Sequence, residues 1–344
     1  MIAALVAIAS GRADAPGTLP ERPPFVGAAA IARSGAAGAA ACDRTLTVRA
    51  ARRLARMRST HGGRAVERFV NAMRPGQTAC LRRGIYRGDV AIWRSGVTLR
   101  SWPGERVRIV GRIWIKRRAR DVELHALELD GRNRARLPSP TVNGDGARFV
   151  GVDVTTRNAG ICFIIGSTRY GRAVGTAIEG SRIHHCGRLP ARNTEHGIYV
   201  AEADDTLIAG NVIHDNADRG IQLYPNAQRT VIERNVIDRN GQGIIFSGAD
   251  GHASSGNVVR NNVISNARIR ADVESWYPAG NPRGVGNVVV RNCVFGGRTG
   301  TIDLSGGGFV AIDNVVADPG YADPAAGDYR LAPTSPCAPV LAGS

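Results

Sequence analysis

Residues 177–186 read AIEGSRIHHC, and the same phrase returns four more times along the chain. The later copies are LIAGNVIHDN at 207–216, VIERNVIDRN at 231–240, VVRNNVISN at 258–266 and VVVRNCVF at 288–295, and a weaker copy ends at Gly151. Internal repeats with a period of about 20 to 50 residues indicate a solenoid or another stacked architecture. The shared corner position falls at residues 151, 181, 211, 235, 262 and 292, which are 30, 30, 24, 27 and 30 residues apart.

A second phrase, glycine followed by isoleucine, comes after four of these corners, at Gly160, Gly197, Gly220 and Gly243. Within each phrase apolar and polar residues alternate, which is typical of a strand with one buried face. One run is too short to bury that face alone, so each turn of the chain must stack on the next. The corner asparagine is suited to a left-handed conformation and to a hydrogen bond with the asparagine one coil away. A helical solenoid is disfavoured, because the repeats lack long stretches of 3.6-residue periodicity.

The phrase Asn-x-Ile-x-x-Asn followed by Gly-Ile-x-Leu resembles the right-handed parallel β-helix repeat of the pectate-lyase-like superfamily. The resemblance covers roughly residues 80–316. It implies an all-β fold, a right-handed parallel β-helix (a solenoid). A short N-terminal capping α-helix is expected in addition. The superfamily hosts lyases, epimerases, hydrolases and non-enzymatic adhesins, so the resemblance is specific for fold and not for activity.

Both ends of the chain fit a capped solenoid. Val66, Phe69, Val70 and Met73 share one helical stripe, and this helix is expected to plug the N-terminal end, where open strand edges would otherwise aggregate. The last residues resemble the closing segment of secreted β-helix proteins and are expected to cover the last coil. The expected division is a signal segment at 1–15, a disordered lead-in at 16–41, and a single β-helix domain at 42–344, in which 42–79 form the N-terminal cap, about 80–316 the repeat coils and 317–344 the closing segment.

The chain carries 45 Lys and Arg against 29 Asp and Glu, a formal charge of +16. This excess favours anionic partners. Zinc-finger spacing, a basic helix and an aromatic-plus-basic motif are missing from the sequence, which argues against nucleic acid. No apolar run reaches the ~20 residues that span a bilayer. We therefore expect a secreted monomer that binds an acidic polysaccharide, with no membrane span.

Alternation along each strand predicts which side chains face outward beside the bend glycines. The isoleucine after each glycine points inward, while the residue before it and those two and four after it point outward. Glu195 and Asp218 lie at the edge of this face, and Glu274 and Trp276, in the segment 268–278 that interrupts the repeat, join it by register. The predicted outward set across three coils is His196, Tyr199, Arg219, Gln222, Tyr224 and Gln242.

This set suits β-elimination from a uronic acid, which needs a base, a cation to neutralise the carboxylate and an acid for the leaving oxygen. His196 would be the base, Arg219 the neutralising cation and Tyr199 the acid. The other residues of the face, Glu195, Asp218, Gln222, Tyr224, Gln242, Glu274 and Trp276, would bind substrate. The pairing of His196 and Tyr199 resembles the active sites of alginate-type lyases and epimerases on this fold, although the epimerase motif Asp-Pro-His is replaced here by Thr194-Glu195-His196.

Other functions stay open. Epimerisation shares the first step of elimination, and a non-catalytic glycan-binding or cell-surface β-helix needs no such step. Hydrolysis needs a second carboxylate at a defined distance, and the doublet Asp204-Asp205 reads as an ordinary turn. Two equivalent histidines, His184 and His214, are followed by Asp238 and would form a solvated stack more readily than a metal site. No cofactor is predicted. Calcium stays open as an alternative, but it is unsupported, because this face has no cluster of outward Asp residues of the kind that a calcium site gathers.

The cysteines show no CxxC pair, so a metal centre is weakly supported. An even number in an exported chain permits disulfides. Cys42 with Cys80 is the favoured pair, because both flank the same cap, and the other cysteines are disulfide-bonded or buried thiols. Aligned on Gly160, Cys162 is expected to point outward. The six cysteines are Cys42, Cys80, Cys162, Cys186, Cys293 and Cys337.

Overall fold

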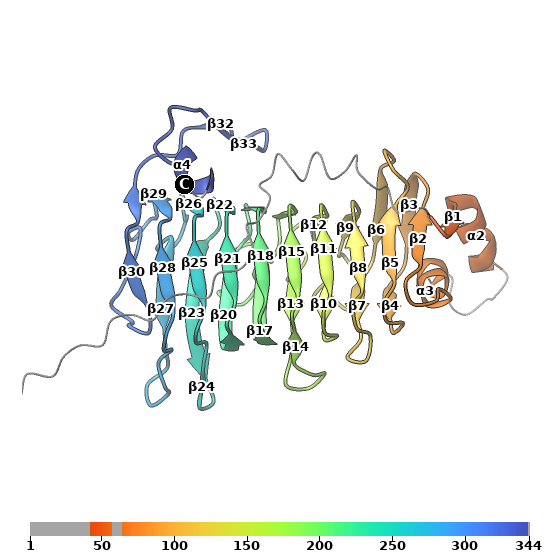
Figure 1. Cartoon of the computed structure of the whole chain (residues 1–344), viewed down its shortest axis with the longest axis horizontal. Helices are drawn as coiled ribbons and strands as arrows, with labels where there is room; N and C mark the ends of the chain where they lie inside the picture. Colours follow the sequence, from red (N-terminus) through yellow and green to blue (C-terminus); the bar gives the residue numbers. More distant parts are fainter. Residues whose placement is uncertain (1–41, 57–63, 343–344) are drawn as a thin grey trace, which may run out of the picture.

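The computed structural model describes residues 42–56 and 64–342. This part of the chain is a rod in which short strands stack coil upon coil (Figure 1). Each complete coil contributes one strand to each of three long sheets, which we call sheets A, B and C, and neighbouring coils pair in parallel. The predicted parallel β-helix is therefore confirmed. The predicted signal segment and lead-in, residues 1–41, lie outside the described residues.

Sheet A contains β1 (Arg44–Leu46), β2 (Thr78–Leu81), β5 (Thr98–Ser101), β8 (Glu123–His125), β11 (Arg148–Val150), β15 (Ala177–Glu179), β18 (Leu207–Ala209), β21 (Val231–Glu233), β25 (Val258–Arg260), β28 (Val288–Val290) and β30 (Val310–Ile312). Sheet B contains β3 (Gly84–Arg87), β6 (Val107–Val110), β9 (Glu128–Asp130), β12 (Asp153–Thr155), β16 (Arg182–His184), β19 (Val212–His214), β22 (Val236–Asp238), β26 (Val263–Ser265), β29 (Cys293–Phe295) and β31 (Val315–Val316). Sheet C contains β4 (Val90–Ile92), β7 (Ile113–Ile115), β10 (Thr141–Val142), β13 (Phe163–Ile165), β14 (Ala173–Val174), β17 (Ile198–Asp204), β20 (Arg219–Gln228), β23 (Gln242–Ala249), β24 (His252–Ala253) and β27 (Val273–Trp276).

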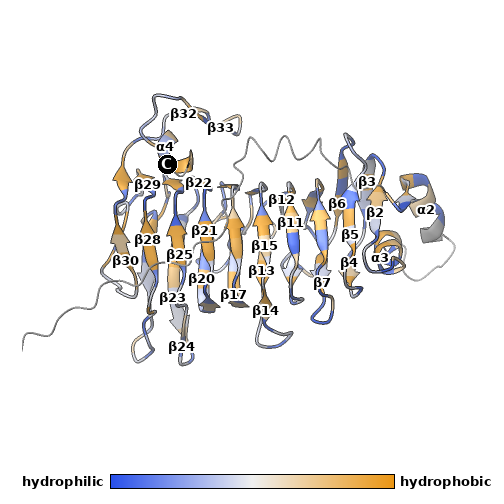
Figure 2. Ribbon diagram, viewed as in Figure 1, coloured by the Kyte–Doolittle hydropathy of each residue, from blue (hydrophilic) through white to orange (hydrophobic). Residues whose placement is uncertain are grey.

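The core of the rod consists of aliphatic rows, one residue per coil. Ile198, Ile221 and Ile244 pair in register on sheet C, and all three are fully buried. Equivalent rows run inside sheets A and B, and the hydrophobic colour in Figure 2 follows the stacked strands. Stacking thus gives each short strand the buried face that it cannot form alone.

The corner between sheets A and B carries a ladder of asparagines, all of them buried except the last. Each Nδ2 donates to the Oδ1 of the next asparagine at 2.9 Å, as predicted. The left-handed residue is the one before the asparagine, for example Arg234 at φ 53°, and not the asparagine itself as expected. The asparagine is needed for its amide, while its neighbour makes the turn. The ladder runs through Asn211, Asn235, Asn262, Asn292 and Asn314.

Two helices close the N-terminal end of the rod, at the orange end of Figure 1. α3 (Ala65–Asn71) corresponds to the predicted capping helix. Its stripe residues, together with Met73, are buried in the main core cluster. The preceding helix, α2 (Val48–Arg56), was not predicted, and it packs against α3 and β3.

The C-terminal segment does not lie over the last coil as expected. It folds back along the outer face of sheet B as the antiparallel hairpin β32 (Tyr321–Asp323) and β33 (Asp328–Leu331), followed by α4 (Ala338–Ala342) (Figure 1). Arg182 and Arg239 donate to backbone oxygens of the hairpin. The final strands β30 and β31 keep exposed valines and isoleucine at the end of the rod.

All six cysteines are paired, as Cys42–Cys80, Cys162–Cys186 and Cys293–Cys337. The favoured pair is confirmed, and the alternative of free thiols is wrong. Within the described residues, no helix is both long and apolar enough to cross a membrane.

Candidate functional site

A groove of about 600 Å³ lies on the outer face of sheet C, over β17, β20, β23 and β27. A smaller hollow of about 320 Å³ adjoins it and shares Arg219. Gln242 and Asp218 line the smaller hollow, whereas Glu195 lines neither space. Seven of the predicted residues line the groove: His196, Tyr199, Arg219, Gln222, Tyr224, Glu274 and Trp276.

The pairing register explains why these side chains meet. Tyr199 pairs with Gln222, Gln222 with Ile245, and Ile245 with Glu274, so the four residues form one outward row. The predicted register fails one coil earlier, because Phe163 and not Ile161 pairs with Ile198. Cys162 therefore takes the place of a bend glycine and is buried instead of facing outward.

His196 stands at the floor of the groove and is only 2% exposed. Burial, followed by the nearby Arg219 charge, lowers the pKa of its imidazole well below 6.5, against a smaller opposing contribution from Gln222. Nδ1 has no hydrogen-bond partner within the described residues. The imidazole is therefore neutral at neutral pH, the state that a base requires, but its unpaired Nδ1 is itself buried.

Arg219 lies one coil from His196 and is 6% exposed. Its guanidinium donates only to neutral groups: Nε to Gln242 Oε1 at 3.0 Å, and the terminal nitrogens to Gln222 and to both oxygens of Asn193. No carboxylate among residues 42–56 and 64–342 forms an ion pair with it, and burial lowers its pKa. A buried cation without an ion-pair partner provides a site for an anionic ligand, although the carboxylates of Asp218 and Glu274 lie near enough to offset part of the lowering of its pKa.

Aromatic rings form one wall of the groove. Tyr199 meets His196 edge to face at 5.6 Å and stacks with Tyr224 at 6.2 Å. Burial raises the pKa of Tyr199 well above 10, so its phenol stays protonated at neutral pH. Trp276 on β27 is 57% exposed, and its free ring suits stacking on a sugar. Glu274 beside it lies 3.6 Å from Arg270.

The predicted edge residues hold the loop before β17 in place. The Asp218 carboxylate accepts from the backbone N–H groups of Asn193, Thr194 and Glu195 at 2.7 to 2.8 Å. Glu195 is buried and pairs with Arg188 at the other end of the same loop. Both carboxylates are therefore occupied by the protein itself, and they position Asn193 against Arg219.

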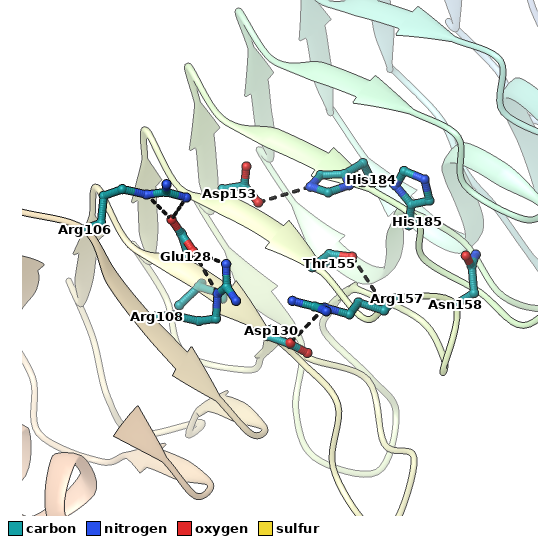
Figure 3. A pocket seen from close by; sticks show the side chains of 11 residues that line it. Arg106, Arg108, Glu128, Asp130, Asp153, Thr155, Arg157, Asn158, His184 and His185 are labelled. Carbon is teal, nitrogen blue, oxygen red and sulfur yellow. Dashed lines mark hydrogen bonds and ion pairs between the residues drawn. The ribbon is translucent and has the colours of Figure 1, made fainter. Parts of the chain in front are cut away.

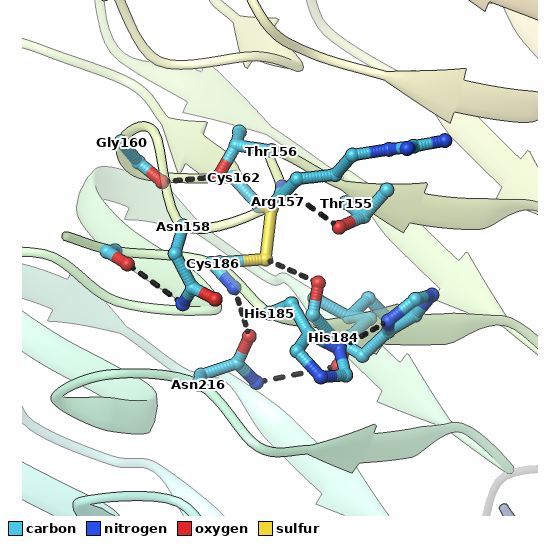
Figure 4. Close-up of a disulfide and its surroundings, with 12 residues drawn as sticks. Thr155, Thr156, Arg157, Asn158, Gly160, Cys162, His184, His185, Cys186 and Asn216 are labelled. Atoms are coloured by element: carbon cyan, nitrogen blue, oxygen red, sulfur yellow. Dashed lines mark hydrogen bonds between the residues drawn. A yellow bond between two sulfur atoms is a disulfide. The ribbon is translucent and has the colours of Figure 1, made fainter. Parts of the chain in front are cut away.

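A disulfide fastens this loop to the preceding coil (Figure 4). Cys162 donates its backbone N–H to the carbonyl oxygen of His196 at 3.2 Å. Cys186 does not line the groove. Its backbone N–H donates to the side-chain oxygen of Asn216, which belongs to a second asparagine ladder. The Cys162–Cys186 bond thus supports the coil that carries the imidazole.

The protein-family model for the right-handed β-helix region matches residues 141–317, slightly more than half of the chain. The chain belongs to this right-handed β-helix family. No curated protein matches it.

Two solved structures share the fold of this β-helix. The pectate lyase Pel9A is 12% identical, with a TM-score of 0.58, and the match covers 86% of this chain and 91% of the lyase. The alginate lyase from Paenibacillus sp. str. FPU-7 is 15% identical, with a TM-score of 0.56, and the match covers 79% of this chain and 99% of that one. At these identities the likeness shows a common fold.

A second pocket, of about 390 Å³, lies on sheet B of the β-helix (Figure 3). Its arginines are engaged by acids: Arg106 and Arg108 pair with Glu128, and Arg157 pairs with Asp130. His184 Nε2 lies 3.1 Å from Asp153 at its edge. The three arginines of this pocket are therefore all paired with carboxylates, unlike Arg219 in the groove.

The predicted histidine stack is present on the same sheet of the β-helix. The rings of His184 and His214 are 5.2 Å apart and nearly parallel. His214 and Asp238 are buried, and Tyr329 of the C-terminal hairpin lies against His214, so this part of the row is covered and not solvated as expected, while His184 stays partly exposed at the second pocket. In the described ranges, no group of three or more His, Cys, Asp or Glu side chains could hold a metal ion.

Five further residues of the β-helix line the groove but were not predicted as site residues, namely Asn193, Thr194, Ile245, Ser247 and Arg270. Ser247 lies four residues after Gly243 and follows from the register used for Tyr224. Asn193 and Arg270 belong to loops that do not repeat, so no periodic signal marks them.

Proposed function

We propose that this β-helix binds an acidic polysaccharide in the sheet C groove and cleaves it by β-elimination at a uronic acid unit. One observation carries the proposal: Arg219 is a buried cation without a carboxylate partner, beside a neutral imidazole and a protonated phenol in the same groove. The two similar structures are a pectate lyase and an alginate lyase by name, which supports the same class of chemistry. Three disulfides support export from the cell.

The chemistry follows from the position of each group. The uronate carboxylate would bind Arg219, which neutralises the charge that develops when the adjacent C–H bond breaks. His196 would take that proton, and the electron pair forms a carbon–carbon double bond as the glycosidic C–O bond breaks. Tyr199 would donate its proton to the leaving oxygen. Trp276 and Tyr224 would hold the neighbouring sugar rings.

Activity on a panel of polyuronates tests the proposal. The wild-type protein should release chain ends with the unsaturated bond, read by ultraviolet absorbance. Arg219→Gln should lower kcat/KM by about 100-fold or more, since it removes the charge stabilisation of the transition state. Arg270→Gln is the matched control, because Arg270 is an exposed cation of the same groove that already faces Glu274; it should cost only a few-fold.

The pH profile gives an independent reading. The pKa of His196 lies well below 6.5, so the imidazole stays unprotonated as the pH falls from 8 to about 6, and kcat/KM should stay level there. Tyr199, whose pKa is raised, should keep the rate level up to about pH 9. A single-proton fall centred near pH 6.5 would contradict His196 as the base.

A non-catalytic glycan-binding protein is the second candidate. It is favoured by the burial of His196, since an imidazole that is 2% exposed has little freedom to approach a substrate proton. Binding of polyuronates without any unsaturated product would select this function. Epimerisation would instead change the sugar configuration without cleaving the chain. Hydrolysis has less support, because Glu195 and Asp218 are both engaged by the loop.

A further inference from the structure

A cluster of cations and aromatic rings lies on the outer face of sheet C, toward the capped end of the rod. The Arg112 guanidinium lies 4.3 Å, and the Lys116 Nζ 2.9 Å, from the centroid of the Trp114 ring on β7. Tyr170 meets the same indole edge to face at 5.3 Å, and Arg169 lies over Tyr170. Lys116 is the only lysine of the chain.

These cations are only partly neutralised by the protein: the carboxylates of Asp89 and Glu67 raise the pKa of Arg112 and Lys116, respectively, against the larger effect of burial. Neither Arg112 nor Lys116 forms an ion pair with a carboxylate of the described ranges; Asp89 accepts from the backbone N–H of Arg112 and not from its guanidinium. Burial lowers the pKa of both groups, and the Arg112 charge further lowers that of Lys116. Two like charges held against one indole are stabilised by any anion that contacts both.

The cluster continues the row of residues that forms the groove. Trp114 pairs with Thr141, Thr141 with Ile164, and Ile164 with Tyr199, so the indole and the Tyr199 phenol face the same side, three coils apart. At about 4.8 Å per coil, the separation is roughly 14 Å along the rod. Trp93, which follows β4 and precedes Lys116 by one coil, is 52% exposed and offers a free ring.

We infer that Arg112, Lys116 and Trp114 form a distal subsite for a carboxylate of the same acidic polysaccharide, with Trp93 stacking on a sugar ring. The identity of the polymer rests on the proposed function; the subsite itself rests on the unpaired charges and the shared face. A chain laid along sheet C would thus be held at two places. The subsite would strengthen the binding of long polymers.

Equilibrium binding of a long polyuronate to the full chain tests the subsite. Lys116→Gln should weaken binding about tenfold, the loss of one charge-assisted contact, while Lys116→Arg should bind like the wild type. Arg291→Gln, which removes a more exposed positive charge at a corner away from sheet C, should leave the affinity unchanged. The melting temperature of each variant checks that the fold is kept.

The outcomes separate the subsite from the proposed elimination. Polymer binding that depends on Lys116, without unsaturated product, would support the subsite and refute elimination. Cleavage with full affinity in Lys116→Gln would refute the subsite alone. Equal losses in Lys116→Gln and Arg291→Gln would reduce the cluster to general surface charge. Tighter, Lys116-dependent binding of a single-stranded oligonucleotide than of polyuronate would overturn the carboxylate assignment.

Discussion

At the scale of single residues, burial decides the protonation of the groups around the groove. His196 and Arg219 lose part of their basicity in the wall of sheet C, and Tyr199 loses acidity. Asp272 shows the same effect in a structural role. Its carboxylate, fully buried, accepts from the backbone N–H groups of Ala267 and Gly297 and so anchors the segment that carries Glu274 and Trp276.

The buried carboxyl group of Asp272 should make the free energy of unfolding depend on pH. Burial raises its pKa to about 7, so the folded protein holds a proton that the unfolded chain loses at lower pH. Its contribution is therefore complete in acid and is lost as the pH rises through 7, at up to roughly 1.4 kcal/mol per pH unit. Denaturant unfolding of wild type and Asp272→Asn should show the wild-type advantage shrinking as the pH rises from about 4 to about 7 and then levelling off. A difference that does not change with pH would refute this; Asp250→Asn, at an exposed turn, controls for the lost charge.

At the scale of elements, the corners matter as much as the strands. Strands of three residues bury an aliphatic row, but each corner leaves backbone groups that need partners. The asparagine ladder supplies them: Asn235 donates Nδ2 to Ile208 O, and its Oδ1 accepts from the backbone and side-chain N–H groups of Asn211. Each corner thereby fixes the position of the next coil, and so the alignment of groove residues.

Substitution of an asparagine in the middle of the ladder should therefore destabilise the fold more than substitution of the one at its end. Asn235→Ala leaves buried donors of Asn211 unpaired and should lower the free energy of unfolding by about 3 kcal/mol. Asn314→Ala, at the half-exposed end of the same ladder, should cost clearly less. Urea unfolding of the two variants compares them directly, and equal losses would count against the ladder as a stabilising element.

At the scale of the whole molecule, sheets B and C of the rod differ in how much of their outer face is covered. Sheet B is partly covered by the C-terminal hairpin, whereas sheet C carries the groove and the distal cations on one open side. The chain as a whole bears a charge of +16. A long anionic polymer lying along sheet C would experience both this general field and the specific unpaired cations.

The general field predicts a strong salt dependence. Raising ionic strength from about 50 mM to about 500 mM shortens the Debye length several-fold, so polyuronate binding should weaken markedly. A neutral polysaccharide of similar length should show little change. Titrations at several salt concentrations measure the slope, and a polyuronate affinity independent of salt would show that charge does not guide binding.

The repeated phrases predicted the parallel β-helix and the row that brings Tyr199 beside Gln222, because alternation and periodicity are local properties that stacking copies from coil to coil. The apolar stripe from Val66 to Met73 predicted the capping helix. The repeated phrases failed at the coil before the regular repeats, although they placed Glu274 and Trp276 correctly in the segment that interrupts the repeat. The true bend position is Cys162, two residues after Gly160. The coil that carries Gly160 was therefore misaligned, and Cys162 was wrongly predicted to point outward. The Cys42–Cys80 pair was predicted from its place beside the cap.

Only the folded chain decides the rest. Asn193 reaches Arg219 because Asp218 captures the loop, and Arg270 reaches the groove through an insertion that Asp272 anchors. The cluster at Trp114 lies in coils whose sequences do not repeat the phrase, so no alignment could link it to Tyr199. The return of the C-terminal hairpin over sheet B depends on contacts between residues more than 80 apart. Such contacts leave no periodic trace, since they form between side chains that only the completed rod brings together.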